Sequence, residues 1–225
     1  FAGNARLFQL FDYRRALMDE GENYARTRAW MQLTSMLTRY ESAACLALHD
    51  FGQHRRMLDV GGNSGEFALQ ACRRHPQLRA TVLDLPLVCE IGLEHVLRQP
   101  ERGRIGFVKA DVRRESLPPG YDLITFKSML HDWPEAEALQ FLDRAAGAVE
   151  PGGTVLIYER LPIRIEAATP AFSLLPILLF FRSYRDPEAY AVRLRERGFT
   201  DVVRSEIDLD TPFAVLTARK PGGRR

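Results

Sequence analysis

Residues suited to binding a nucleotide-like ligand lie in two short stretches of the first half of the chain. The first, 58–65, reads Leu-Asp-Val-Gly-Gly-Asn-Ser-Gly, and the second, 82–86, reads Val-Leu-Asp-Leu-Pro, with its carboxylate at Asp84. An apolar strand that runs into a glycine-rich turn and a helix, followed by a second strand that ends on a carboxylate, is the first half of a nucleotide-type site on a parallel sheet.

The spacing of the glycines indicates which nucleotide. A dinucleotide fingerprint needs glycines two and five residues after the first, and counting from Gly61 puts Glu66 at the last of these positions. A carboxylate there would repel the pyrophosphate that a helix N-terminus attracts. S-adenosylmethionine (SAM) has no phosphate and carries a cationic sulfonium. The stretch fits the acidic-x-Gly-x-Gly-x-Gly pattern of class I methyltransferases through Asp59, Gly61 and Gly65, with Asn63, which tolerates positive φ, at the middle glycine.

His131 is the candidate for proton transfer. A phenol has a pKa of about 10 and an imidazole one of about 6.5, so a neutral histidine is a usable base at pH 7. A lone histidine ahead of a helix is more often an N-cap or a solvated residue. Taken alone, the residue leaves both interpretations open.

The composition is that of a globular protein. With 225 residues, 46% hydrophobic and 27% charged, the chain can bury one good core, and a net charge of +2 gives no case for nucleic acid. Three cysteines without a C-x-x-C pair and scattered histidines predict neither disulfides nor a metal site. No signal peptide is visible, and the longest apolar run, 167–181, is too short for a bilayer. We expect a cytoplasmic protein without membrane contact.

The predicted elements follow the order of an α/β fold. Two N-terminal helices, 4–20 and 23–48, come first. Alternating strands and helices follow, with strands expected at 57–60, 80–85, 105–109, 121–127 and 153–159, and helices at 65–75, 87–98 and 135–149. After a helix at 187–197, the strands 201–207 and 213–218 are joined by a link too short for a parallel crossover. We therefore expect a Rossmann-like, mostly parallel sheet with a C-terminal antiparallel hairpin, preceded by N-terminal helices.

Five stretches occur in an order that is typical of one family: 58–65, 82–86, 109–112, 126–133 and 156–159. The fourth, 126–133, reads Phe-Lys-Ser-Met-Leu-His-Asp-Trp. Together they resemble the SAM-dependent O-methyltransferases of plant phenolics and bacterial antibiotic tailoring, the caffeic acid O-methyltransferase type. The resemblance covers residues 25 to 220. The Lys-x-x-x-His-Asp-Trp stretch is fairly specific, and more so in combination with the glycine turn.

The resemblance implies a SAM site. Asp84 would lie at the ribose, Leu85 would also belong to the cofactor site, and Asp111 and Val112 would lie at the adenine. Lys127 would also belong to the cofactor site, together with three residues of the glycine stretch: Asp59, Gly61 and Gly62. Two simpler interpretations stay open, since Asp111 could cap a turn and Lys127 could be a surface lysine.

The resemblance also implies that His131 is the general base of methyl transfer to a hydroxyl and that Glu159 orients it. Asp132 and Trp133 are expected to serve helix entry and packing. Tyr184 stands where the family often has a second acidic partner of the histidine. A tyrosine can still form a hydrogen bond but offers no charge.

The family carries a helical dimerisation domain ahead of this fold, and the stretch before Met57 is too short to hold all of it. We expect a helical lead-in at 1–50, a SAM-binding domain at 51–220 and a tail at 221–225. The chain would be a homodimer or a module of a multidomain biosynthetic enzyme. Apolar residues between 172 and 180 suit an aromatic or polyketide acceptor. A methyltransferase fold repurposed for hydroxylation or decarboxylation, and a non-catalytic domain, are the alternatives.

Overall fold

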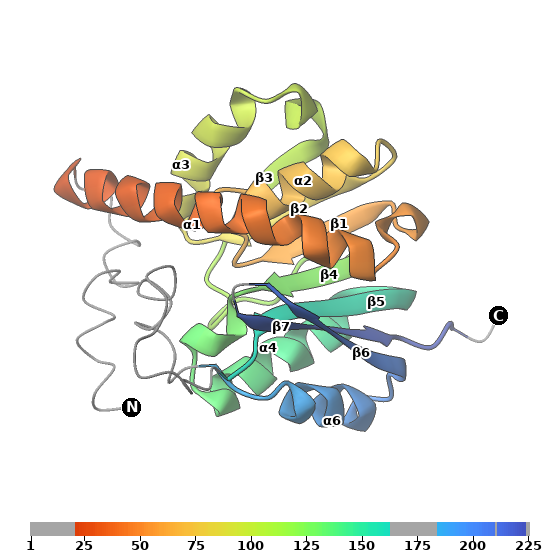
Figure 1. Ribbon diagram of the computed structural model, residues 1–225. Helices are drawn as coiled ribbons and strands as arrows, with labels where there is room; N and C mark the ends of the chain where they lie inside the picture. Colours follow the sequence, from red (N-terminus) through yellow and green to blue (C-terminus); the bar gives the residue numbers. More distant parts are fainter. Residues whose placement is uncertain (1–20, 163–183, 210, 224–225) are drawn as a thin grey trace.

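Seven strands form one sheet in the order β3-β2-β1-β4-β5-β7-β6 (Figure 1). This computed structural model describes residues 21–162, 184–209 and 211–223. Strands β1 to β5 are parallel, while β7 is antiparallel to both β5 and β6. The strands are β1 Arg56–Val60, β2 Arg79–Asp84, β3 Ile105–Lys109, β4 Tyr121–Lys127, β5 Val149–Arg160, β6 Thr200–Asp208 and β7 Pro212–Arg219.

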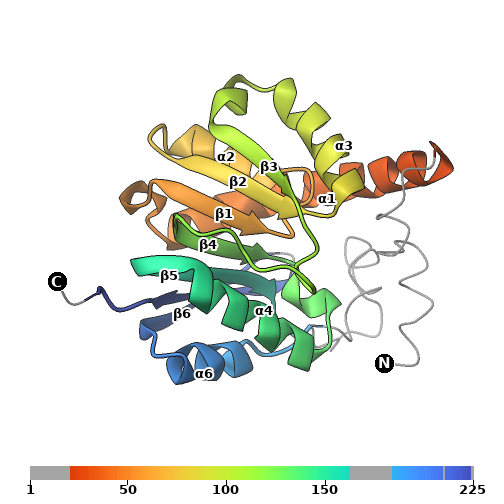
Figure 2. The same cartoon turned by 180° about the vertical axis from the view of Figure 1, so that it is seen from behind.

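Helices cover both faces of the sheet (Figures 1 and 2). The helices are α1 Gly21–Leu48, α2 Glu66–Arg74, α3 Pro86–Leu97, α4 Glu135–Ala148 and α6 Glu188–Glu196, with short 3₁₀ turns η3 Phe51–Gln53, η4 Pro100–Arg104 and η5 Leu130–Asp132. Apolar residues of α1 and α2 pack on one face, and those of α4 and α6 on the other. Neighbouring residues such as Met57 and Leu58 belong to opposite cores, as the two-residue period of a strand requires.

The expected fold is confirmed, including the parallel strands and the antiparallel C-terminal pair. All seven predicted strands are present, and β5 begins earlier than predicted because Val149 already pairs with Tyr121. The predicted helix 23–48 is α1. The predicted helix 4–20 and the apolar run 167–181 lie outside the described residues. Among the helices that the structure describes, none is long and apolar enough to cross a membrane.

Candidate active site

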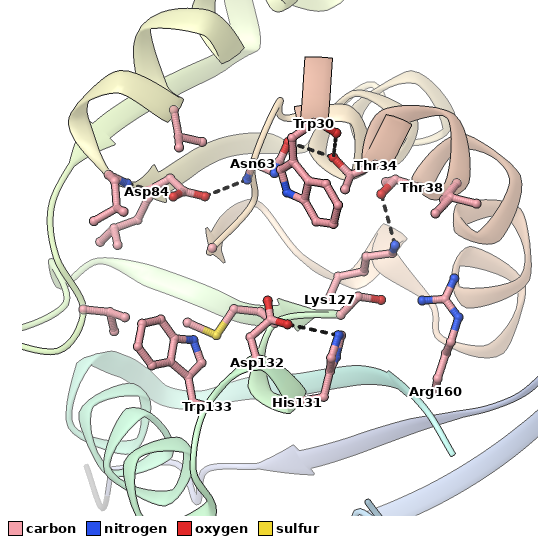
Figure 3. A pocket seen from close by; sticks show the side chains of 18 of the residues that line it. Trp30, Thr34, Thr38, Asn63, Asp84, Lys127, His131, Asp132, Trp133 and Arg160 are labelled. Carbon is pink, nitrogen blue, oxygen red and sulfur yellow. Dashed lines mark hydrogen bonds and ion pairs between the residues drawn. The ribbon is translucent and has the colours of Figure 1, made fainter. Parts of the chain in front are cut away.

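A cavity opens at the carboxyl ends of the parallel strands, with α1 lying across it (Figure 3). Its walls come from α1, from the glycine turn after β1, from the segments that follow β2, β3 and β4, and from Arg160 and Tyr184. The carboxyl ends of a parallel sheet are where α/β proteins bind ligands. Six of the eight predicted cofactor residues line this cavity: Gly61, Asp84, Leu85, Asp111, Val112 and Lys127.

The glycine turn brings bare backbone to the cavity wall. Gly61 has φ +67°, and a Cβ at this position would lie 2.5 Å from Cγ of Met129. Asn63 also has a positive φ, +55°, as the sequence interpretation requires. Its backbone N–H donates to Oδ2 of Asp84 at 2.8 Å, so the turn and the end of β2 are joined.

Asp84 keeps acceptor capacity toward the cavity. Its Oδ1 accepts a hydrogen bond from the Leu85 N–H at 2.8 Å, and its Oδ2 accepts the one from Asn63. A carboxylate oxygen has about two lone-pair sites, so each oxygen has one left for a ligand. Burial raises the pKa of Asp84 to about 6, although the two backbone hydrogen bonds oppose the shift. A ligand with two neighbouring hydroxyl groups matches this carboxylate.

Asp111 lies at the cavity wall and holds a turn at the same time. Its Oδ1 accepts hydrogen bonds from the backbone N–H and from Nε of Arg113, and its Oδ2 accepts one from Nη2 of the same residue. Burial would raise the pKa of Asp111, but the Arg113 guanidinium lowers it below its usual value. Val112 lines the cavity beside it. Asp111 therefore caps the turn, as the simpler interpretation expects, and also lines the cavity, as the cofactor interpretation expects.

The side chain of Lys127 is only 8% exposed, so the interpretation of a surface lysine is wrong. Its Nζ donates to Oε2 of Glu41 at 2.5 Å and to Oγ1 of Thr38 at 3.0 Å, both on α1. Glu41 also pairs with Arg160, and its side chain is 2% exposed. One buried carboxylate thus serves two buried cations at the cavity wall, which leaves an excess of positive charge there.

Asp59 and Gly62 lie behind the wall and do not line the cavity. Asp59 is fully buried, and its Oδ1 accepts a hydrogen bond from Thr125 Oγ1 at 2.7 Å. A Cβ on Gly62 would lie 2.5 Å from Oδ2 of Asp59, so the carboxylate packs directly under the turn. Burial raises the pKa of Asp59 to about 7. The structure gives Asp59 the position of a support for the glycine turn.

Glu66 turns away from the cavity. Its carboxylate accepts hydrogen bonds from Arg39 on α1 at 3.0 Å and from Gln70 at 2.7 Å, and it pairs with Nε2 of His95 on α3 at 2.8 Å. Burial would raise the pKa of Glu66, but these partners lower it to about 2. Glu66, whose position in the glycine pattern disfavours a dinucleotide, therefore links α2 to α1 and α3.

His131 and Glu159 form a buried pair. Nδ1 of His131 lies 2.6 Å from Oε2 of Glu159, and the two residues are 8% and 3% exposed. Because an ionised carboxylate can only accept, Nδ1 carries the hydrogen and Nε2 is the basic nitrogen of the neutral ring. Burial would lower the pKa of His131, but the negative charges of Glu159 and Asp132 raise it above its usual value.

Asp132 faces His131 and the cavity, a position that the sequence interpretation did not give it. Its Oδ1 is 3.4 Å from Nε2 of His131, and it lines the cavity (Figure 3). The expected helix-entry role is wrong, because α4 begins after Pro134 without a side-chain cap. Trp133 does pack, with its ring 5.5 Å from that of Phe141, and it lines the cavity as well.

Tyr184 contacts the histidine through its ring. The ring centroids of His131 and Tyr184 are 5.0 Å apart and the planes make an angle of 63°, an edge-to-face contact. Burial raises the pKa of the Tyr184 hydroxyl to about 12, so it stays neutral. The guanidinium of Arg160 lies 5.9 Å from the Tyr184 ring and 4.7 Å from that of Phe213.

Comparison with known proteins decides the family. The O-methyltransferase domain matches residues 10–200, most of the chain. The chain belongs to this O-methyltransferase family. It is 33% identical over 196 residues to 3-hydroxy-5-methyl-1-naphthoate 3-O-methyltransferase of Streptomyces sahachiroi, covering 85% of this chain and 55% of that protein. It is 32% identical over 176 residues to acetylserotonin O-methyltransferase of Bos taurus, covering 77% and 50%.

Solved structures of the family share the fold. The apo form of the SAM-dependent methyltransferase SibL has a TM-score of 0.70 and 30% identity, covering 93% of this chain and 62% of that one. Human N-acetylserotonin methyltransferase in complex with SAM has a TM-score of 0.73 and 24% identity, covering 89% and 57%. The family expected from the motifs is confirmed. The chain spans about half the length of the curated relatives it matches.

Proposed function

We propose that this chain binds SAM in the cavity and transfers its methyl group to a hydroxyl of a small aromatic acceptor, with His131 as general base. The observation that carries the proposal is the His131–Glu159 pair at 2.6 Å, with Nε2 beside a cavity whose far wall carries Asp84. Bound SAM would supply an electrophilic methyl group. The residues of the chain would bind it, orient the acceptor and take the proton.

The residues of the cavity fit SAM in charge and shape. Asp84, with Leu85 beside it, has one acceptor site on each oxygen for the two ribose hydroxyls. The methionine part would lie along the bare backbone of Gly61, which lines the cavity, while Gly62 packs on Asp59 behind it. The excess positive charge around Lys127 suits its carboxylate.

The adenine would lie at Asp111 and Val112, which follow β3 and line the same cavity. Asp111 would accept a hydrogen bond from the exocyclic amine, and Val112 would cover the ring.

The proton of the acceptor hydroxyl would pass to Nε2 of His131. Glu159 stabilises the imidazolium that forms, because its charge lies on the opposite ring nitrogen. Asp132, 3.4 Å from Nε2, would hold the charged ring from the acceptor side. Methyl transfer to a phenol needs no more acid–base chemistry than this one proton transfer.

The acceptor is proposed to be aromatic or a polyketide. Trp30, Leu33 and Leu37 of α1 and Met129 give the cavity apolar walls. The Streptomyces relative is named for a hydroxynaphthoate and the bovine relative for acetylserotonin, both aromatic. The neocarzinostatin O-methyltransferase, of the same fold at 23% identity, was solved with S-adenosylhomocysteine (SAH) and 1,4-dihydroxy-2-naphthoic acid. A homodimer, or a place in a multidomain biosynthetic enzyme, is part of the same proposal.

Isotope-labelled SAM with a panel of hydroxynaphthoates and N-acetylserotonin tests this function. The expected product carries the labelled methyl group on oxygen, by mass spectrometry. SAM binding without methylation of any acceptor, but with hydroxylation or decarboxylation, would favour the repurposed fold. Absence of SAM and SAH binding by calorimetry would favour a non-catalytic domain.

A further inference from the structure

We propose that Arg160 binds an anionic group of the acceptor, a carboxylate carried by the same aromatic system as the hydroxyl that is methylated. This inference rests on the proposed function and deepens it, because it names the chemical class of the acceptor as an aromatic hydroxy acid. The sequence patterns gave Arg160 no role.

Arg160 is a buried cation at the cavity wall. It ends β5, is 6% exposed and lines the cavity. Among the residues that the structure describes, its guanidinium makes one hydrogen bond, from Nη2 to Oε1 of Glu41, and its buried Nε has no hydrogen-bond partner. A guanidinium carries five N–H groups, and a buried donor without an acceptor costs free energy. Oxygen atoms of a ligand at this guanidinium would lower that cost.

Two aromatic rings orient the guanidinium of Arg160. Its central carbon lies 4.7 Å from the centroid of the Phe213 ring and 5.9 Å from that of the Tyr184 ring. Such contacts stabilise the positive charge, but the face of a ring offers no oxygen or nitrogen lone pair to the N–H groups. A planar guanidinium binds a carboxylate through two parallel hydrogen bonds. The oriented side chain is therefore suited to a carboxylate.

The charge of Arg160 lacks a counter-charge of its own. Glu41 is shared between Arg160 and Lys127, so one carboxylate faces two buried cations. Glu159, the preceding residue, accepts from His131 and from two backbone N–H groups. The carboxylate of SAM comes with an ammonium and a sulfonium, so the cofactor as a whole adds positive charge. Because buried charges are normally paired, we expect the missing negative charge on the acceptor.

Arg160 lies where the acceptor would lie. In Figure 3 it is on the far side of Lys127 and His131 from Asp84, the proposed ribose partner. The Tyr184 ring contacts both Arg160 and His131, with its centroid 5.9 Å from the guanidinium carbon and 5.0 Å from the centroid of the imidazole. An aromatic acceptor with its hydroxyl at Nε2 of His131 can therefore direct a carboxylate toward Arg160.

A purely structural Arg160 would hold Glu41 and never touch the acceptor. Calorimetric titration of the enzyme–SAH complex with hydroxynaphthoates and with the corresponding hydroxynaphthamides separates the two roles, because the amide keeps the shape of the acid and loses its charge. We expect the wild type to bind at least one acid about tenfold or more tightly than its amide. Arg160→Gln should lose this preference while its affinity for SAH stays nearly unchanged.

Arg204→Gln is the matched control, because Arg204 on β6 pairs with Asp186 and Glu206 and does not line the cavity. It should keep the wild-type preference for the acid. If Arg160→Gln does not fold, Arg160→Lys is titrated instead. That variant keeps the charge and loses the planar fork, so it should bind the acid more weakly and the amide as the wild type does.

Three results would overturn the inference. The first is a wild type that binds no acid more tightly than its amide, and the second is an acid preference that survives unchanged in the Arg160 variant. The third is a loss of SAH affinity in Arg160→Gln with the acid preference kept, which would place Arg160 at the carboxylate of the cofactor. A wild type that binds no SAH would contradict the proposed function, whereas SAH binding without an acid preference would contradict this inference alone.

Discussion

Glu159 holds both the ring of His131 and the turn that carries it. Its Oε2 accepts from Nδ1 of His131, while its Oε1 accepts from the backbone N–H groups of Met129 and Leu130 at 2.9 and 2.7 Å. Burial would raise the pKa of Glu159, but His131 lowers it below its usual value, so the carboxylate is ionised at neutral pH. One buried side chain thus sets the tautomer and the position of the His131 imidazole and favours its charged form.

Glu159→Gln should therefore reduce the rate of methyl transfer by about 10²- to 10⁴-fold. This is most of the loss expected when the general base itself is removed. An amide gives no charge to the imidazolium and can place a donor against Nδ1–H. Tyr184→Phe should change the rate little, because Tyr184 contacts His131 through its ring. Single-turnover rates of the two variants and of the double mutant separate the roles. A fully active Glu159→Gln enzyme is the result that contradicts the pair.

The activity should rise with pH through an inflection above about 6.5, the usual pKa of histidine. His131 must be neutral to accept the proton, and its pKa is raised by Glu159 and Asp132 against the effect of burial. The profile of kcat/KM against pH measures this pKa in the free enzyme. In Asp132→Asn the inflection should move to lower pH, because one of the negative charges that raise the pKa of His131 is removed.

Asp186→Asn controls the pH experiment, because Asp186 is paired with Arg204 in an exposed contact and does not line the cavity. Its inflection should match that of the wild type. An Asp132→Asn profile that also matches would exclude Asp132 from the environment of the titrating group.

Sequence patterns were sufficient for the sheet because the parallel strands contain apolar runs, and because β1 and β2 run directly into Gly61 and Asp84. The strand end also indicated Asp84. His131 and Glu159 were predicted from the resemblance of their stretches to the methyltransferase family. Glu41 could not be found this way. It lies 86 residues from Lys127 and 119 from Arg160, so only the packing of α1 brings them together.

Two further limits of the sequence are local. Asp132 follows the histidine directly, and only the 3₁₀ turn η5 aims its carboxylate at Nε2. Asp59 fits the cofactor motif, yet the structure puts it beneath Gly62, because the motif describes the turn and not the direction of each side chain. Thr34, Thr38 and Glu41 recur at helical spacing on α1, a signal that could have marked its cavity face.

Asp84→Ala should weaken SAH binding by about 1.5 to 3 kcal/mol or more, because the ribose hydroxyls lose a charged acceptor. Calorimetry measures the affinity, and circular dichroism checks the fold. Glu66→Gln is the control. It should lower the free energy of unfolding by about 1 to 3 kcal/mol, since Glu66 joins Arg39 and His95, and leave SAH affinity nearly unchanged. Wild-type affinity in Asp84→Ala would remove Asp84 from the cofactor site.

Glu41→Gln should lower the free energy of unfolding by about 3 to 5 kcal/mol, because the buried Lys127 and Arg160 lose their shared counter-charge. The added positive charge at the site should leave SAH binding at least as tight as in the wild type. Urea unfolding and calorimetry measure the two quantities. A variant of wild-type stability would show that α1 is not held through Glu41.

The rate of methyl transfer by His131→Ala in a single turnover, measured beside its affinity for SAH, tests the central claim most directly. The account predicts a loss of about 10²- to 10⁴-fold in rate at pH 7 with SAH affinity nearly unchanged, because the imidazole faces the acceptor and the cofactor is held elsewhere. Full activity of His131→Ala would contradict it, and would mean that the base lies elsewhere or that positioning alone drives the transfer.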